Sequence, residues 1–144
     1  VDYVFKAARR YKIHPNEIVI IGSKIALLQE IDFLIRTSEK FNERTLTTFE
    51  SKEDLKDFSK ENQKKIRGKK KTGFNLNSGV IKVSTIHSFK GYESPTVFLI
   101  IDDVDSPELV YVGLTRAKIN LVVFVKKKSK YEDFFIKSLG KECP

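Results

Sequence analysis

Residues 85–93 concentrate side chains that could contact a phosphate group. Six of these residues carry the candidate chemistry: Thr85, His87, Ser88, Lys90, Gly91 and Glu93. Hydroxyls and backbone N–H groups are common phosphate contacts, an ammonium adds a point charge, and a glycine permits close backbone approach or a positive φ. The carboxylate could accept a hydrogen bond from a ribose hydroxyl. A polar turn between two strands, with the histidine hydrogen-bonded locally, explains the same residues, so the pattern alone leaves both interpretations open.

A second segment, residues 110–118, places one arginine on a predicted helix. Val110, Leu114 and Ala117 are spaced so that they would face a sheet. Arg116 would lie on the flank of that face, from which a long side chain can reach across a domain cleft while its stem stays packed. Its planar, permanently charged guanidinium suits a phosphoryl group in transfer. The alternative is a surface arginine in an ion pair.

Strands and helices are predicted to alternate along the chain. Apolar runs predict strands over 18–21, 45–49, 80–85, 96–101 and 120–126, the first of them buried on both faces. Helical spacing and caps predict helices over 2–12 and 24–37, after Ser51 with Asp54 as its capping partner, from 105–108 to about 118, and over 129–139 before Gly140. This alternation predicts an α/β sandwich with a mostly parallel sheet, in which ligands sit beyond the carboxyl ends of the strands.

Residues 64–73 are rich in lysine, and we expect an exposed loop there. The helix before it has only a thin apolar side, formed by Leu55, Phe58 and Ile66. The chain of 144 residues fits one domain and carries 27 Lys and Arg against 19 Asp and Glu, a formal net charge of +8. Such an excess favours a polyanion such as nucleic acid as partner, and a lysine-rich solubility surface is the alternative.

The composition also indicates a cellular setting. No apolar run approaches the ~20 residues that a membrane helix needs, and the start of the chain lacks the features of a signal peptide. The one cysteine, Cys143, permits neither an internal disulfide nor a cysteine-based metal site. We therefore expect a cytoplasmic protein with no membrane contact and no bound metal of its own. The absence of methionine indicates an excised fragment.

Together the two polar segments resemble motifs V and VI of superfamily 1 DNA helicases of the UvrD/Rep/PcrA type. The motif V pattern is close to T-[IV]-H-x-[ASF]-K-G-x-E before an apolar strand, as in residues 85–93 and the run that follows. The motif VI pattern is close to [LR]-x-Y-V-[GA]-x-T-R-A-[KR]-x-x-L, as in residues 109–121. The resemblance spans about a quarter of the chain and implies a RecA-like (P-loop NTPase-like) three-layer sandwich, the second motor domain of a helicase.

The resemblance implies a role for each candidate residue. Arg116 would be the arginine finger, the catalytic residue that reaches the γ-phosphate of ATP. That ATP, with Mg²⁺, would be bound mainly by the N-terminal motor domain of the same protein. The nucleotide-binding residues would be Lys90, Gly91, Glu93 and Arg116. The nucleic-acid-binding residues would be Thr85, His87 and Ser88, in contact with single-stranded DNA or, as the alternative, RNA, along which the family moves from 3′ to 5′.

Two departures from the family pattern qualify this prediction. The chain contains no G-x-x-x-x-G-K-[ST] segment, so the chain alone is expected not to hydrolyse ATP. Ile21 and Gly22 stand where the family has an aromatic residue followed by arginine at the end of motif IV. The missing motif IV arginine keeps an alternative open, a degenerate, non-catalytic nucleic-acid- or protein-interaction domain with the helicase-like fold.

Overall fold

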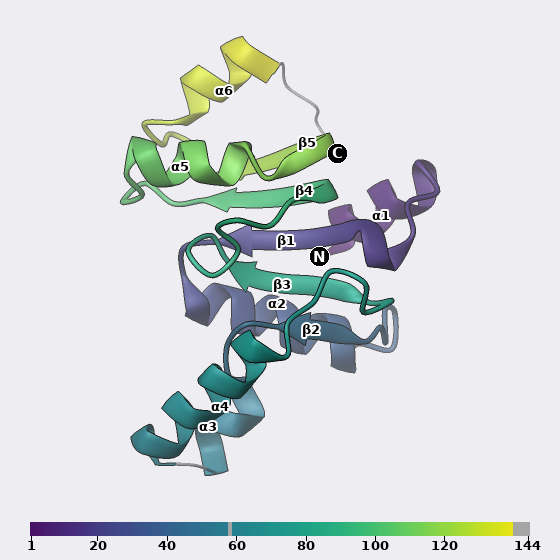
Figure 1. Ribbon diagram of the computed structural model, residues 1–144. Coiled ribbons are helices and arrows are strands. Elements are labelled where there is room, and N and C mark those ends of the chain that lie inside the picture. The colour runs from purple at the N-terminus through teal and green to yellow at the C-terminus, as the bar shows by residue number, and fades with distance from the viewer. Residues whose placement is uncertain (58, 140–144) are drawn as a thin grey trace.

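Five parallel strands form a single central sheet in the computed structural model, which describes residues 1–57 and 59–139 (Figure 1). The strands are β1 (Ile18–Gly22), β2 (Thr45–Thr47), β3 (Ile81–Thr85), β4 (Ser94–Ile101) and β5 (Ala117–Val125). Their order is β2-β3-β1-β4-β5, and every described pair is parallel. The predicted, mostly parallel α/β sheet is therefore confirmed.

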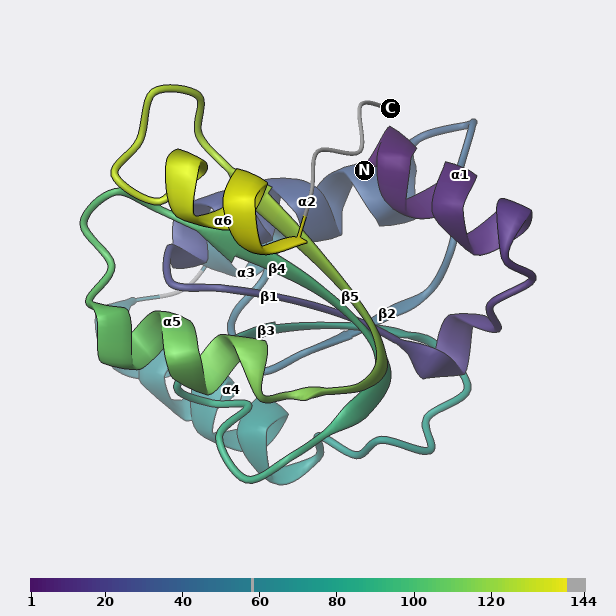
Figure 2. The ribbon, with the colours of Figure 1, turned by 90° about the horizontal axis from the view of Figure 1, so that it is seen from above.

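Helices cover both faces of this sheet and give three layers (Figure 2). On one face lie α1 (Asp2–Arg10) and α2 (Ile25–Thr37). In the chain, α1 is followed by the short helix η1 (Pro15–Glu17), and α2 is followed by β2. The other face carries α5 (Pro107–Leu114) and α6 (Glu132–Leu139). Strand β1 shows why both faces are apolar: Val19 and Ile21 join the α5 and α6 side, and Ile18 and Ile20 join the α1 and α2 side.

The lysine-rich segment is a helix, so the predicted loop over about 64–73 is wrong. Helix α4 runs from Lys60 to Thr72, after α3 (Lys52–Asp57), and both lie beyond the β2 edge of the sheet. Ser59 caps α4 by accepting a hydrogen bond from the Asn62 backbone N–H. Lysine, glutamine and arginine are good helix formers. Three of the four residues on the side of α4 that faces the protein, Gln63, Arg67 and Lys70, are polar, which concealed the helical period.

The helix that carries the second motif is shorter than predicted. α5 ends at Leu114, residues 115 and 116 form a turn, and β5 begins at Ala117 because Ala117 pairs with Ser94 of β4. Arg116 therefore leaves from a turn and not from a helix flank. Within α5, the Cβ of an alanine at Gly113 would lie 2.7 Å from Leu99 Cδ1, so the glycine allows α5 to pack closely on β4.

The other predicted boundaries agree with the structure to within a few residues. Ser51 and Asp54 form the predicted reciprocal cap, and Ser106 caps α5 with Pro107 in the first turn. Leu55, predicted on the thin apolar side of its helix, is instead exposed on α3. Phe58, Gly140 and Cys143 lie outside the described residues.

Candidate functional site

The turn that follows β3 is anchored by two apolar side chains. Ile86 and Phe89 are fully buried in the core on the α5 side of the sheet. The Ser88 backbone N–H donates to Thr85 Oγ1 at 3.1 Å, and the Phe89 N–H donates to the Thr85 carbonyl at 3.0 Å. These bonds fix a tight turn at the carboxyl end of β3.

The same turn points its polar side chains outward. His87 and Lys90 are exposed, and Ser88 is half-buried. Thr85 is buried, and its hydroxyl oxygen already accepts the bond from Ser88. A phosphate near this turn would therefore meet His87, Ser88 and Lys90 first, with Thr85 acting mainly as the residue that shapes the turn.

Residues 86–93 cross from one end of the sheet to the other. Thr85 ends β3 level with Gly22 of β1, whereas Ser94 begins β4 beside Ala117, at the end where the strands start. Gly91 makes this crossing possible with a φ of +91°, a left-handed conformation that favours glycine. Nothing lies within 4 Å of the position of a Cβ at Gly91, so the requirement there is conformational and not steric.

The guanidinium of Arg116 lies against the end of the crossing segment. Its Nη1 donates to the Tyr92 carbonyl at 3.1 Å, its Nε donates to the Val112 carbonyl at 2.9 Å, and its Nη2 donates to Thr115 Oγ1 at 3.0 Å. The Arg116 carbonyl also accepts from the Ser94 N–H at 3.0 Å. Guanidinium carries five N–H groups, so, in the part of the chain that the structure describes, two remain for a ligand.

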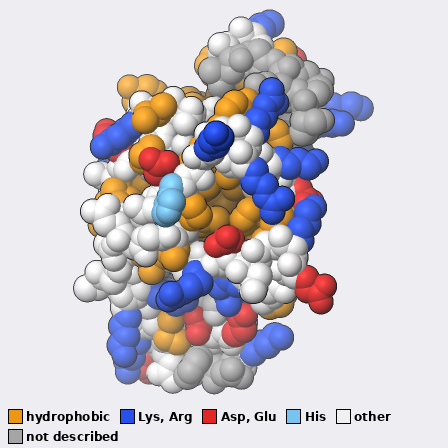
Figure 3. Space-filling model, turned by 90° about the vertical axis from the view of Figure 1, so that its right-hand side faces the viewer, with side chains coloured by type: hydrophobic (Ala, Val, Ile, Leu, Met, Phe, Trp, Pro, Cys, Tyr) orange, Lys and Arg blue, Asp and Glu red, His pale blue; other side chains and the backbone are white. Residues whose placement is uncertain are grey.

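Glu93 lies in the same region as Arg116. Its carboxylate is 3.7 Å from the Lys118 ammonium, and each side chain is about half exposed. An ion pair this long and exposed contributes little to stability, so both groups remain able to exchange partners. Figure 3 shows this end of the molecule, where the strands start, with Lys and Arg side chains gathered around an apolar area.

The candidate residues thus fall into two groups at opposite ends of the sheet. His87, Ser88 and Lys90 lie at or near the carboxyl end of β3, and Glu93 and Arg116 lie where β4 and β5 start. An aromatic cluster joins the two groups: the Phe89 and Tyr92 ring centroids are 5.7 Å apart, and Phe74 packs on Phe89 at 6.1 Å and on Tyr92 at 5.7 Å. The sequence alone did not predict this separation.

A pocket at the carboxyl ends of β1, β4 and β5 contains none of the predicted site residues. It has a volume of about 270 Å³ and is bordered by Gly22, Lys24, Asp102 and Lys126, among others. Lys24 and Asp102 form an ion pair of 2.7 Å across it. The hydrogen bond with Asp102, helped by its charge, raises the pKa of Lys24, and the same bond lowers the pKa of Asp102.

Gly22, which stands where the family has the motif IV arginine, lies on the border of this pocket. Gly22 ends β1, where a Cβ would lie 3.4 Å from the Ile100 carbonyl oxygen. Lys24, two residues on, is engaged by Asp102. The signal that could have found this pair is the position of both residues just after buried strands.

Two further searches cover the described residues 1–57 and 59–139. They contain no group of three or more His, Cys, Asp or Glu side chains arranged to hold a metal ion. Among their helices, none combines the length and the apolar character needed to cross a bilayer.

Comparison with known protein families found a match within the second half of the chain. Residues 81–124 match the family model of the UvrD-like helicase C-terminal domain. The match begins with β3 and ends within β5, so it includes the crossing segment and Arg116. The comparisons with curated proteins and with solved structures found no match.

Proposed function

We propose that this chain is the second motor domain of an ATP-dependent single-strand translocase, because residues 81–124 match the UvrD-like helicase C-terminal domain and the parallel sheet fits a RecA-like sandwich. The complete protein would then be a helicase of the cytoplasm that moves from 3′ to 5′ on DNA. One observation carries the proposal: Arg116, from the second motif, donates a hydrogen bond to Tyr92 in the segment that forms the first.

Arg116 is the residue proposed to act on ATP. Its two remaining N–H groups fit a γ-phosphate presented by the other motor domain, and its permanent charge would stabilise the charge that develops during phosphoryl transfer. The bonds to Val112 and Tyr92 hold the side chain in place before ATP arrives. Glu93 and Gly91 would contact the remainder of the nucleotide. Lys90, which lies with the turn after β3, could serve either the nucleotide or the nucleic-acid strand. ATP supplies the transferred phosphoryl group, and its Mg²⁺ would be held mainly by the other domain.

The nucleic-acid strand is proposed to bind at the turn after β3. His87 and Ser88 present an imidazole and a hydroxyl to solvent, and Thr85 positions the Ser88 backbone. Such contacts read the sugar-phosphate backbone and carry no base sequence. A translocase requires contacts of this kind because it must move over any sequence.

The test is steady-state ATP hydrolysis by the full-length protein with and without single-stranded DNA. We expect DNA to stimulate hydrolysis, and Arg116→Ala to lower kcat by about 10³-fold or more, with ATP binding retained. Arg116→Lys keeps the charge and loses the planar fork, so it should restore little activity. Arg44→Ala, which removes an exposed arginine elsewhere, is the matched control. Wild-type turnover in Arg116→Ala would exclude the finger role.

A second candidate function is a non-catalytic interaction domain that kept the fold. Gly22, in place of the motif IV arginine, favours it, because Lys24 is held by Asp102 and cannot substitute without breaking that pair. The two candidates differ in one measurement: the interaction domain would bind nucleic acid or protein without DNA-stimulated ATP hydrolysis. A P-loop in the full-length sequence would support the motor.

A further inference from the structure

Helix α4 divides its residues cleanly between an inner and an outer face. The half-buried residues are Gln63, Ile66, Arg67 and Lys70, which recur at helical spacing, and the remaining residues of α4 are exposed. Seven of the 13 residues of α4 are Lys or Arg, in the sequence KENQKKIRGKKKT. The burial pattern therefore sorts these cations into two sets with different surroundings.

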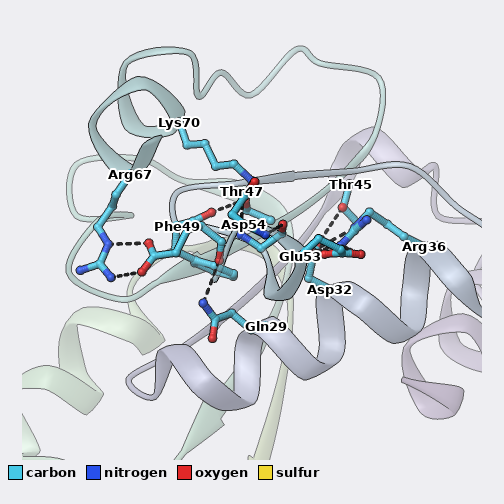
Figure 4. A network of polar contacts seen from close by, with 12 residues as sticks. Gln29, Asp32, Arg36, Thr45, Thr47, Phe49, Glu53, Asp54, Arg67 and Lys70 are labelled. Carbon is cyan, nitrogen blue, oxygen red and sulfur yellow. Dashed lines mark hydrogen bonds and ion pairs between the residues drawn. The ribbon is translucent and has the colours of Figure 1, made fainter. Parts of the chain in front are cut away.

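The two inner cations are neutralised by carboxylates of the preceding segment. Arg67 forms two hydrogen bonds to the buried carboxylate of Glu50, and Lys70 lies 3.3 Å from Asp54 (Figure 4). Lys70 also donates to Thr47 Oγ1 at 3.4 Å. These cations serve the attachment of α4 to the domain and are not available to a partner.

The outer face carries five cations: Lys60, Lys64, Lys65, Lys69 and Lys71. The only acid in α4 is Glu61, whose carboxylate is 3.6 Å from Lys65 with both side chains largely exposed. The other four lysines form no ion pair with any residue whose side chain the structure describes, namely residues 1–56 and 59–138. From Lys60 to Lys71 the helix is roughly 16 Å long. The outer face is therefore a strip of positive charge that does not hold α4 to the rest of the domain.

The strip is attached to the candidate strand-binding turn. Directly after α4, Phe74 is buried and packs against Phe89 and Tyr92 of the crossing segment. Phe89 is also the residue that anchors the turn bearing His87 and Lys90. The end of α4 and that turn therefore share one aromatic cluster.

We propose that the outer face of α4 binds the phosphate backbone of the same nucleic-acid strand that the turn at 87–90 contacts. This inference rests on the proposed function. Lysine ammonium groups on flexible stems act as point charges, so the contact is independent of sequence and strengthens binding by displacing counterions. Along the axis of B-DNA, one strand places a phosphate about every 3.4 Å, so a strip of this length faces more than one phosphate.

The test measures the salt dependence of binding to a fluorescent oligo-dT strand by the full-length protein. The test variant carries Lys64→Gln, Lys69→Gln and Lys71→Gln. We expect its slope of log K against log salt, which is negative, to become shallower by about 0.7 for each lost contact, or about 2 in total. The control Lys6→Gln, Lys127→Gln, Lys137→Gln removes three exposed lysines elsewhere, so both variants lower the charge of +8 equally. The control should keep the wild-type slope.

Each outcome has a separate meaning. A wild-type slope in the α4 variant, or an equal loss in both variants, would overturn the inference while leaving the proposed function intact. Absence of oligo-dT binding by the wild-type protein would instead defeat the proposed function. Loss of binding to phosphatidylserine vesicles, with oligo-dT binding unchanged, would show that α4 serves a membrane and also overturns the inference. Circular dichroism checks folding, and the single variant Lys69→Gln, with an expected loss of about 0.7, provides the test if the triple variant does not fold.

Discussion

The ion pair between Arg67 and Glu50 should decide how firmly α4 is held. Only 4% of the Glu50 side chain is exposed, whereas 39% of the Arg67 side chain is. Arg67→Gln would leave a buried carboxylate without its counter-charge. Removing one partner of a fully buried pair costs about 3–5 kcal/mol, and because Arg67 borders solvent, water can replace part of what it supplies. We therefore expect a loss of about 2 kcal/mol in the free energy of unfolding.

The reverse substitution should cost less. In Glu50→Gln the carboxylate that needs compensation is gone, and the Arg67 guanidinium can turn toward water. The double variant should accordingly recover most of the stability that Arg67→Gln loses. The assay is urea unfolding of the four proteins of this double-mutant cycle at neutral pH, followed by circular dichroism. A loss below about 0.5 kcal/mol in Arg67→Gln, or a larger loss in Glu50→Gln, would refute this reasoning.

The same pair predicts a dependence on pH. The hydrogen bonds from Arg67 lower the pKa of Glu50 below its ordinary value of 4.5. A carboxyl group with a lowered pKa in the folded state contributes stability above its unfolded pKa and loses it as the pH falls through the folded pKa. The advantage of wild type over Glu50→Gln should therefore hold above about pH 4.5 and shrink below it.

Two further substitutions test other parts of the structure. Gly68 lies on the exposed side of α4 with nothing within 4 Å of its Cβ position. Gly68→Ala should therefore raise the free energy of unfolding by about 0.5–1 kcal/mol, measured with urea. A lower free energy of unfolding would contradict the assignment of residue 68 to a helix. Burial lowers the pKa of Lys82 from 10.5 to about 8, although its ammonium donates to two oxygens of Asn16. Because the unfolded chain binds the Lys82 proton more tightly, the free energy of unfolding of wild type should rise relative to that of Lys82→Met between about pH 8 and 10.5. A difference that stays constant across that range would contradict the lowered pKa.

Residues whose environment follows from local pattern were predicted well. The β-branched run at β1 is buried on both faces, and the caps at Ser51 and Ser106 start their helices, because short-range chemistry determines these features. The position of Arg116 depended on where its helix ends. The prediction placed Arg116 on the helix, whereas it lies in the turn after α5. Strand pairing of Ala117 with Ser94 ends α5 early, and this contact between distant segments is not visible in helical spacing.

Helix α4 shows the second limit of prediction from the sequence. Its inner stripe consists of Gln63, Ile66, Arg67 and Lys70. Such a stripe resembles a solvated segment until Glu50 and Asp54, more than a dozen residues away, are known to face it. Similarly, the sequence brought the candidate residues into one group, whereas the structure spreads them along the length of the sheet because residues 86–93 traverse it.

That traverse has a mechanical consequence. Eight residues join Thr85 to Ser94, and Ile86 and Phe89 are pinned in the core along the way. With two buried anchors among its eight residues, this segment has little freedom to move independently of the sheet. A phosphate that drew Arg116 away from the Tyr92 carbonyl would break the hydrogen bond that holds the end of residues 86–93. We expect the backbone at His87 to shift in response. We therefore expect a displacement of Arg116 at one end of the sheet to be passed to the turn at the other end through residues 86–93.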